Sequence, residues 1–315
     1  MNVNPLISVI MNCYNSSLYL KEAIESVINQ TYSNWEIIFW DNQSTDESAI
    51  IFNSYKDKRL NYFYAERHTT LSTARNLAIE KANGEILAFL DCDDLWMAEK
   101  LEEQTPFFVN YQNVGIVYSN FEILLNSSNS SAKSMLTSFS KIRCYPHLPK
   151  NIYRVLLGAN FIIFSSVLIR KLIYDQVNGF SDKFNHNEDY ELLLKCSALS
   201  DAVCIKNNAL RYRVHDTNSS YSNQEIGYLE NRTIFNSLKP DRWVNKAINI
   251  NEARYLIFLL LKSKKIKYLT ALFNFNVLKG LVGLISRRIY ITFFGINNLN
   301  PVYCVLSVYF VATAF

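Results

Sequence analysis

The sequence lacks several features that mark other protein classes. Its six cysteines include no C-x-x-C pair, so their even number gives little support to a disulfide framework. Residues 1–5 have neither the basic stretch nor the apolar stretch of a secretory signal. We therefore expect a cytosolic protein with reduced thiols. Residues 1–30 contain no glycine, which argues against a nucleotidyltransferase, because that class normally binds its triphosphate with an early loop rich in glycine and basic residues.

Acidic residues are absent from the C-terminal part of the chain: none follows Glu252, whereas eight basic residues do. The other 24 basic residues and all 28 acidic residues give residues 1–252 a charge of about −4. The apolar runs Leu256–Leu261 and Val302–Phe315 are shorter than the ~20 residues that a membrane helix needs. Nucleic-acid binding is not favoured, because the basic residues interleave with long aliphatic runs.

A helical wheel indicates an amphipathic helix in this basic part of the chain. Such a helix lies in a membrane interface, where its cations meet anionic headgroups. We expect residues 226–315 to form a helical, basic and apolar region at an anionic membrane surface; a helical subdomain packed on the rest of the chain is the alternative. The polar stripe consists of Asn276, Lys279, Gly283 and Ser286, opposite Leu278, Leu281, Val282 and Ile285.

Residues 1–120 alternate between two patterns, in a chain whose 315 residues and 49% apolar content suffice for one large core or two smaller ones. Short runs rich in β-branched and aromatic residues suit buried parallel strands. Apolar residues three and four apart predict helices over 20–28 and 72–82, and Asp46 is expected to cap a third helix between them. This order predicts an open α/β sheet. The expected strands are Leu6–Met11, Trp35–Trp40, Leu60–Tyr64, Ile86–Leu90 and Val114–Ser119.

Polar and acidic residues follow three of these strands. Ligands of such sheets bind beyond the carboxyl ends of the strands, so these residues should converge. Carboxylates bunched at a strand end repel each other unless a cation or a polar ligand joins them. An aromatic ring, a carboxylate and an acidic cluster suit the base, sugar and diphosphate of a nucleotide. The three runs are Asn12-Cys13-Tyr14-Asn15, Asp41-Asn42-Gln43-Ser44 and Asp91-Cys92-Asp93-Asp94.

These runs, in this order and with Ala74-Arg75-Asn76 before the last of them, resemble the motifs of the family 2 glycosyltransferases. The resemblance covers about residues 5–220. It implies a GT-A fold, which is a Rossmann-like mixed sheet with flanking helices. Residues 1–225 would be the catalytic domain, with residues 1–120 binding the nucleotide-sugar and residues 121–225 the acceptor.

The resemblance also implies roles for individual residues. Tyr14 and Asp41 would form the nucleobase pocket, where Asp41 accepts the imino hydrogen of a uracil, and Asn15 would lie on the donor nucleotide. Arg75 would contact the donor side and Asp91 the ribose. Asp93 would bind a divalent metal between the phosphates, and its oxygen ligands favour Mn²⁺ or Mg²⁺.

Structural alternatives exist for several of these residues. Tyr14 would otherwise cap the core, and Arg75 would form an ion pair on a helix surface. Asp41 and Asp46 are also typical of turns and helix caps, an interpretation that we prefer for Asp46 and not for Asp41. The acidic neighbours of Asp93 argue against a simple Asx turn there.

The run that starts at Asn187 predicts an amphipathic helix with Glu188 and Asp189 in its first turn. The helix dipole would stabilise carboxylates there without any catalytic role. In the family, an acidic pair at this helix supplies the catalytic base, and its second member matches Asp189. Asp189, with Glu188 as the less favoured alternative, would deprotonate the acceptor hydroxyl in an inverting displacement.

Leu210–His215 is predicted to be an edge strand with cationic side chains. It resembles a tyrosine-arginine-x-histidine stretch of the family, in which a loop folds over the donor diphosphate. Arg213 would then contact phosphate and His215 phosphate or the metal. A solvated strand end is an equally good interpretation for His215.

The chain departs from the family pattern at several positions. Asn42 and Gln43 replace the usual second aspartate and glycine, so we expect a tighter or differently aimed turn. Thr70 stands where a glycine is common. Lys239–Trp243 only faintly resembles the Q-x-x-R-W signature of processive synthases, because its glutamine is missing. Together with the absence of long apolar spans, this favours the transfer of a single sugar over polymerisation.

Two further segments complete the prediction. Asn126–Ser134 is polar and low in complexity, which predicts a mobile loop. Asn151–Arg170 is apolar and is expected to line the acceptor side.

The sequence as a whole predicts a hexosyl- or N-acetylhexosaminyltransferase at the cytoplasmic membrane face, which moves a sugar from a UDP-sugar to a lipid-linked glycan of O-antigen, lipopolysaccharide or capsule. A nucleotidyltransferase and a non-catalytic nucleotide-sugar-binding scaffold are the alternatives.

Overall fold

The computed structural model describes residues 3–126, 144, 146–215 and 224–263. The chain divides into two compact units, Met1–Ser222 and Asn223–Phe315, called here unit 1 and unit 2. The expected loop over Asn126–Ser134 lies outside the described residues except for Asn126, as do the amphipathic helix around residue 280 and the run Val302–Phe315.

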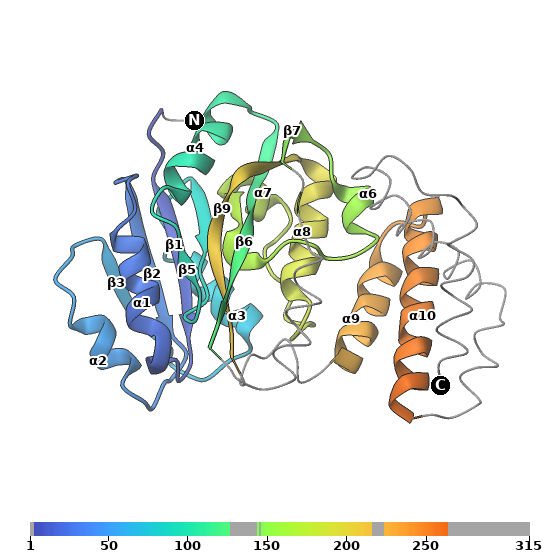
Figure 1. The fold of residues 1–315 in the computed structure, drawn as a ribbon, viewed down its shortest axis with the longest axis horizontal. Helices are drawn as coiled ribbons and strands as arrows, with labels where there is room; N and C mark the ends of the chain where they lie inside the picture. The colour runs from blue at the N-terminus through green and yellow to red at the C-terminus, as the bar shows by residue number, and fades with distance from the viewer. Residues whose placement is uncertain (1–2, 127–143, 145, 216–223, 264–315) are drawn as a thin grey trace. The chain divides into compact units, whose positions relative to one another are not determined.

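Unit 1 is built on one mixed sheet whose described strands follow the order β3-β2-β1-β4-β8-β6-β9-β5, with β7 paired to β9 (Figure 1). The chain enters the sheet at β1, which is buried along almost its whole length. The strands are β1 Ile7–Cys13, β2 Trp35–Asp41, β3 Leu60–Tyr64, β4 Ile86–Phe89, β5 Leu95–Trp96, β6 Val114–Leu125, β7 His147–Lys150, β8 Leu168–Arg170 and β9 Asp201–Val214.

Helices follow most of the early strands, as the periodicity predicts. In α1, Leu20, Ala23, Ile24 and Val27 form the buried face, which is the expected spacing of three and four residues. The helices of unit 1 are α1 Ser17–Ile28, α2 Ser48–Asn53, α3 Leu71–Ile79, α4 Lys100–Asn110, α6 Tyr153–Leu156, α7 Lys171–Gln176 and α8 Glu188–Leu199, with a 3₁₀ turn, η1, at Phe164–Ser166.

Asp46 binds N–H groups at helix starts as the sequence predicts, although Glu47 occupies the N-cap position of α2. Its Oδ1 accepts a hydrogen bond from the backbone N–H of Ser48, the first residue of α2, at 3.0 Å. Its Oδ2 accepts from the N–H of Ser17, the first residue of α1, at 2.9 Å. One carboxylate therefore satisfies free N–H groups at the start of two helices and fixes the β1–α1 and β2–α2 loops to each other.

All five strands that the sequence predicts are present, with two differences in their surroundings. Strands β1 to β4 are parallel, whereas β6 is antiparallel to β8 and parallel to β9. Strand β3 is only partly buried because it lies at the sheet edge.

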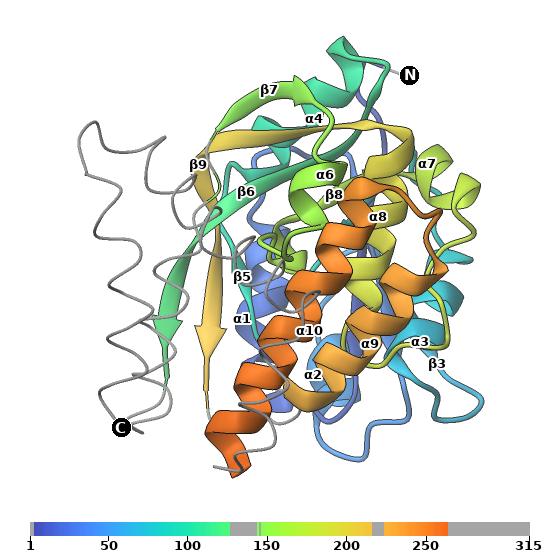
Figure 2. The same ribbon diagram turned by 90° about the vertical axis from the view of Figure 1, so that its right-hand side faces the viewer.

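The prediction that Leu210–His215 is an edge strand is wrong for Leu210 and Arg211, which pair with β5 on one side and with β6 on the other. Tyr212–Val214 continue β9 beside β6, and His215 follows the strand. Figure 2 shows the long strands β6 and β9 side by side. Tyr212, Arg213 and Val214 are buried. The arginines of the sequence suggested solvent, but tertiary partners bury one of them, as described below.

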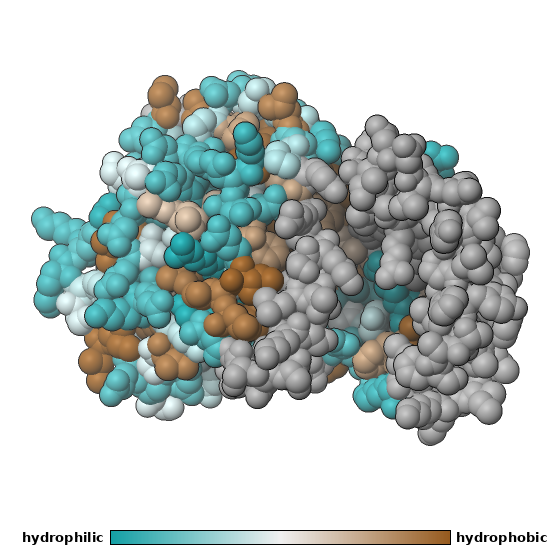
Figure 3. Space-filling model, viewed as in Figure 1, coloured by the Kyte–Doolittle hydropathy of each residue, from teal (hydrophilic) through white to brown (hydrophobic). Residues whose placement is uncertain are grey.

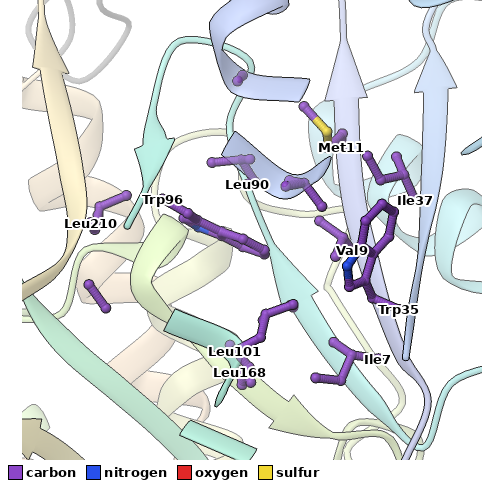
Figure 4. Packing of buried hydrophobic residues seen from close by; sticks show 14 of the residues in the cluster. Ile7, Val9, Met11, Trp35, Ile37, Leu90, Trp96, Leu101, Leu168 and Leu210 are labelled. Carbon is purple, nitrogen blue, oxygen red and sulfur yellow. The ribbon is translucent and has the colours of Figure 1, made fainter. Parts of the chain in front are cut away.

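The core of unit 1 lies between the sheet and its helices. Figure 4 shows side chains from β1, β2, β5, α4, β8 and β9 packed together. Trp35 and Trp96 are its largest members, at 1% and 5% exposed. A fully buried Leu or Ile contributes about 1.5–3 kcal/mol relative to exposure. The cluster therefore fixes β1, β2 and β4, whose carboxyl ends carry the predicted ligand residues.

The described surface is mixed in character. On the face shown in Figure 3, hydrophilic residues alternate with smaller hydrophobic areas. Exposed large apolar side chains of unit 1 include Leu18, Ile50, Leu148 and Leu172. The cysteines among the described residues are all free and buried.

Unit 2 contains α9 Gln224–Ser237 and α10 Arg242–Ser263, so the expected apolar run Leu256–Leu261 falls within a helix. Arg232 donates two hydrogen bonds to Glu252, at 2.6 and 2.7 Å, and thereby joins the two helices. Among the described residues, no helix combines the length and the apolar character that a membrane crossing demands.

Candidate active site

The acidic turn, Asp91–Asp94, follows β4 and is held to neighbouring elements through its backbone. The N–H of Asp94 donates to the carbonyl oxygen of Asp91 at 3.1 Å, which closes the turn. The N–H of Asp91 donates to Ser165 Oγ in η1 at 3.3 Å. The Cys92 thiol donates to the carbonyl oxygen of Asn12 at the end of β1. The predicted convergence of the β1 and β4 ends is therefore present.

Arg75 connects the acidic turn to helix α8. Its Nη1 donates to Glu188 Oε1 at 2.8 Å, and its Nη2 donates to Asp91 Oδ1 at 3.2 Å. The guanidinium also lies over the rings of Phe164 and Phe180, at 4.9 and 5.4 Å from their centroids. Because the Arg75 side chain is 6% exposed, the alternative of an ion pair on a helix surface is wrong.

The two acidic residues at the start of α8 differ in their surroundings. Glu188 is buried, and its Oε1 is taken by Arg75. Asp189 is only partly buried, and its Oδ1 accepts from the N–H of Tyr190 at 2.5 Å. Desolvation by the surrounding chain, and then the charge of Glu188, raise the pKa of Asp189 to about 7. Such a carboxylate can take up a proton near neutral pH, so the geometry favours Asp189 over Glu188 as a base.

Asp93 and His215 lie together at the ends of β4 and β9. Asp93 Oδ2 is 2.9 Å from His215 Nε2, and the side chains are 31% and 13% exposed. Among the described residues, no group of three or more His, Cys, Asp or Glu is arranged to hold a metal ion by itself. Mg²⁺ commonly takes one or two protein ligands and completes its shell with substrate phosphates and water. The carboxylate and imidazole therefore fit an ion that binds together with a diphosphate.

Asp94, the last residue of the acidic turn, points into the protein. It is 1% exposed, and its Oδ1 accepts from the backbone N–H of Arg213 at 2.9 Å. Burial, reinforced by the charges of Asp93 and Asp91, raises the pKa of Asp94 well above its usual range. Asp94 thus joins the acidic turn to β9.

Arg213 lies where the sequence predicts a phosphate contact, but its guanidinium faces protein groups. It donates from Nε to the Asp93 carbonyl at 2.7 Å, from Nη1 to Asn126 at 2.9 Å and from Nη2 to Glu22 at 3.0 Å. Its side chain is 2% exposed. The phosphate contact stays a prediction.

Asp41, the predicted uracil ligand, is fully buried at the end of β2. Its Oδ1 accepts from the N–H of Ser44 at 2.7 Å, and its Oδ2 accepts from the Tyr62 hydroxyl at 2.7 Å. The turn interpretation that we did not prefer is therefore realised in the structure. The predicted uracil contact is not tested by these bonds, but neither carboxylate oxygen is exposed in this arrangement.

The other two residues of the predicted base pocket lie in the β1–α1 loop. Tyr14 is 53% exposed, so the alternative of a core-capping tyrosine is wrong. Its ring contacts that of His68, with centroids 4.4 Å apart. Asn15 has a positive φ of 52°, and its Oδ1 accepts from the N–H of Thr45 at 2.8 Å. Asn15 therefore connects the loops after β1 and β2.

The part of the chain that carries Tyr14, Asp41, Arg75 and Asp93 matches a known protein family. The model of the glycosyl transferase family 2 matches residues 8–176, which is more than half of the chain. The chain belongs to glycosyl transferase family 2. The glycosyltransferase predicted from the sequence is thus confirmed, and the nucleotidyltransferase and scaffold alternatives are wrong.

Relatives and solved structures of this glycosyltransferase agree with the family. The UDP-Glc:alpha-D-GlcNAc-diphosphoundecaprenol beta-1,3-glucosyltransferase WfgD of Escherichia coli is 34% identical over 202 residues, which are 63% of this chain and 74% of that protein. S. aureus TarS 1-349 in complex with UDP-GlcNAc superposes with a TM-score of 0.63 at 15% identity, covering 89% of this chain and 80% of that one. The mannosyltransferase PcManGT of Pyrobaculum calidifontis, in complex with GDP-Man and Mn²⁺, has a TM-score of 0.57 at 14% identity and covers 94% and 89%. The predicted GT-A fold is confirmed by these likenesses.

Several supporting residues of this glycosyltransferase were not found by sequence reasoning. Phe164, Ser165 and Phe180 position Arg75 and Asp91, and Glu22 pairs with Arg213. These residues are distant in sequence from the residues that they contact, so no local sequence pattern identifies them as partners. His68 was also missed, although its proximity to the Ala74-Arg75-Asn76 motif and the small number of histidines offered a weak one.

Proposed function

We propose that this glycosyltransferase transfers one sugar from a UDP-sugar to a lipid-linked glycan acceptor, with inversion, in the biosynthesis of a surface polysaccharide such as O-antigen or capsule. The observation that carries the proposal is the bridge formed by Arg75. It joins Asp91, in the turn proposed to hold the donor, to Glu188, the neighbour of the proposed base. Donor binding and proton removal would thus occur at adjoining points of one site.

The choice of donor is supported by the names of two similar proteins. WfgD uses UDP-Glc by name, and TarS was solved with UDP-GlcNAc. In this chain, the exposed ring of Tyr14 offers a stacking surface for a base beyond the end of β1. Tyr14, Asn15, Asp41, Arg75, Asp91 and Arg213 are the residues that we propose on the donor side.

In the proposed reaction, Asp189 accepts the proton of the acceptor hydroxyl while the hydroxyl oxygen attacks the anomeric carbon. A bond forms between that oxygen and the anomeric carbon, and the bond from the anomeric carbon to the diphosphate oxygen breaks on the opposite face. The electron pair leaves with the nucleoside diphosphate, and the configuration inverts. Arg75 holds Glu188 beside Asp189; burial and then the charge of Glu188 raise the pKa of Asp189, whereas the charge of Arg75 lowers it.

We propose Asp93 and His215 as the protein ligands of a divalent metal ion, Mn²⁺ or Mg²⁺. The pair is supported by its geometry and by the Mn²⁺ in the solved complex of PcManGT. A bound ion would neutralise charge on the leaving diphosphate. Asp93 also anchors Arg213 through its carbonyl oxygen, so the same residue connects the acidic turn to β9.

We propose residues 1–225 as the catalytic domain and residues 226–315 as a membrane-associating region at the cytoplasmic face. The acceptor half would comprise residues 121–225. A lipid-linked acceptor is supported by the diphosphoundecaprenol in the name of WfgD. The eight basic residues after Glu252 would attract anionic lipid, at about 1 kcal/mol for each residue near the surface.

The pH dependence of sugar transfer follows from the raised pKa of Asp189. Below a pH of about 7 its carboxylate is protonated and cannot accept the acceptor proton. We therefore expect kcat/KM to fall about tenfold for each pH unit below 7 and to level off above it. Initial rates with UDP-glucose and a GlcNAc-diphospholipid, measured between about pH 5 and pH 8.5, test this expectation. A profile that is flat down to about pH 5 would contradict Asp189 as a base with this pKa.

A further inference from the structure

We propose that Lys100 is a positioning residue for the donor site. Its side-chain amine, together with the amide of Gln104, holds the η1 turn in place, and η1 in turn holds Asp91. Lys100 acts through the protein and does not contact the donor. This inference rests on the proposed function, because Asp91 lies in the turn proposed to bind the donor nucleotide.

Lys100, the first residue of α4, is buried to an extent that is rare for lysine. Its exposed fraction is 0%, and it is one of the largest fully buried side chains of the described residues. Burial lowers the pKa of Lys100 well below its usual range. An apolar side chain would fill this position without the cost of desolvating an amine. We therefore attribute the lysine to the hydrogen bonds that its amine makes.

These hydrogen bonds converge on one backbone carbonyl of η1. Lys100 Nζ donates to the carbonyl oxygen of Ser166 at 3.1 Å, and Gln104 Nε2 donates to the same oxygen at 3.0 Å. Lys100 Nζ also donates to Gln104 Oε1, four residues further along α4, so the two side chains orient each other. A carbonyl oxygen has two lone pairs, and this one has a donor from α4 for each.

Trp96 holds the preceding carbonyl of the same turn. Its Nε1 donates to the carbonyl oxygen of Ser165 at 2.8 Å. Its ring centroid lies 4.6 Å from Lys100 Nζ, within the range of a cation–π contact. Three buried side chains that lie within nine residues of one another therefore fix two successive carbonyls of η1.

The other groups of η1 contact the candidate active site. Ser165 Oγ accepts from the N–H of Asp91 at 3.3 Å. The ring of Phe164 lies 4.9 Å from the guanidinium of Arg75, which donates to Asp91 Oδ1 at 3.2 Å. Asp91 is thus connected to η1 twice, directly through Ser165 and indirectly through Arg75. A shift of η1 would move Asp91, whose half-exposed side chain is proposed to contact the ribose.

The test measures UDP binding by calorimetry with Mn²⁺, together with urea unfolding, for the full-length wild type, Lys100→Met, Ser165→Ala and the double variant. Methionine is close to lysine in length and removes a buried amine without a large change in volume, so Lys100→Met should fold. Gln104→Leu removes the other donor from α4 and is a second, independent variant. Lys171→Met is the control, because it makes the same substitution on α7 at a side chain that is 32% exposed.

We expect Lys100→Met to weaken UDP binding about 10- to 100-fold, the usual effect of the loss of an outer partner of a metal site. Gln104→Leu should weaken it too, and Lys171→Met should bind UDP as the wild type does. If Lys100 acts through η1, its effect should be several-fold smaller when Ser165 is already alanine, because the direct connection to Asp91 is then lost in both proteins.

An unchanged UDP affinity in folded Lys100→Met, or an equal effect of this substitution in the wild type and in Ser165→Ala, would overturn the role of Lys100 and leave the proposed donor intact. A lysine that served stability alone would lower the urea midpoint and leave the UDP affinity of the folded protein unchanged. Should Lys100→Met fail to fold, the same comparison with Gln104→Leu decides. Wild-type protein that binds no UDP would overturn the proposed donor and the role of Lys100 together.

Discussion

Replacement of Asp189 by asparagine is expected to lower the rate of sugar transfer by about 10²–10⁴-fold, which is the usual contribution of a general base. The amide cannot accept the proton of the acceptor hydroxyl. UDP binding should remain, because Asp189 has no role in the proposed donor contacts. The transfer rate with UDP-glucose and a GlcNAc-diphospholipid, together with UDP affinity measured by calorimetry, checks both parts of this expectation.

Two further variants in α8 distinguish the loss of the catalytic base from the general effect of a neutralised carboxylate on the helix. Glu191→Gln makes a comparable change in the first turn of α8, where Glu191 pairs with Lys195 at 3.2 Å, and it should leave the transfer rate nearly unchanged. Glu188→Gln tests the second candidate for the base. An Asp189→Asn protein that folds and retains most of the transfer rate would remove Asp189 from the mechanism.

Replacement of Arg75 by methionine should destabilise unit 1 by about 3–5 kcal/mol, the usual cost of the removal of one partner from a buried ion pair. Methionine leaves the charge of Glu188, which is 4% exposed, without its cation. It also removes the cation of Arg75 from Asp91 and so adds to the repulsion within the acidic turn. Urea unfolding followed by circular dichroism measures the loss.

A second substitution shows whether the unpaired charge is the cause. Glu188→Gln in the Arg75→Met background removes that charge, so we expect it to restore a large part of the lost stability. Arg211→Met is the surface control: Arg211 and Glu122 are 3.5 Å apart and about half exposed, and their pair should contribute about 0–1 kcal/mol. Equal losses from Arg75→Met and Arg211→Met would contradict the bridge described for Arg75.

The sequence predicts much of the fold, because local patterns determine it. The strand ends bring Tyr14, Asp91 and Asp93 to one edge of the sheet, and an α/β chain gives that edge a fixed direction. Glu188 and Asp189 appear at the start of a helix, as their run of apolar neighbours indicates. These features need no knowledge of distant contacts.

Partners that are distant in sequence account for the errors. The hydrogen bond from Tyr62, on the neighbouring strand, to Asp41 has no signal in the sequence, and the uracil contact of Asp41 stays a prediction. Arg213 looks exposed on a cationic strand, but its guanidinium is buried among Asp93, Asn126 and Glu22, which are distant in sequence. The position of His68 depends on Asn42 and Gln43, whose side-chain bonds to the β3–α3 loop have no signature in a single sequence.

The most direct test of the account is the binding of UDP in the presence and absence of Mn²⁺ to the wild type and to Asp93→Asn, measured by calorimetry with GDP as a control. The central claim is that the carboxylates at the strand ends bind a nucleoside diphosphate together with a metal ion. We expect UDP binding that requires Mn²⁺ in the wild type and is lost in Asp93→Asn, and weaker binding of GDP. Equal binding of UDP by both proteins, with no effect of Mn²⁺, would contradict a metal site at Asp93, and the absence of any nucleotide binding would contradict the donor site as a whole.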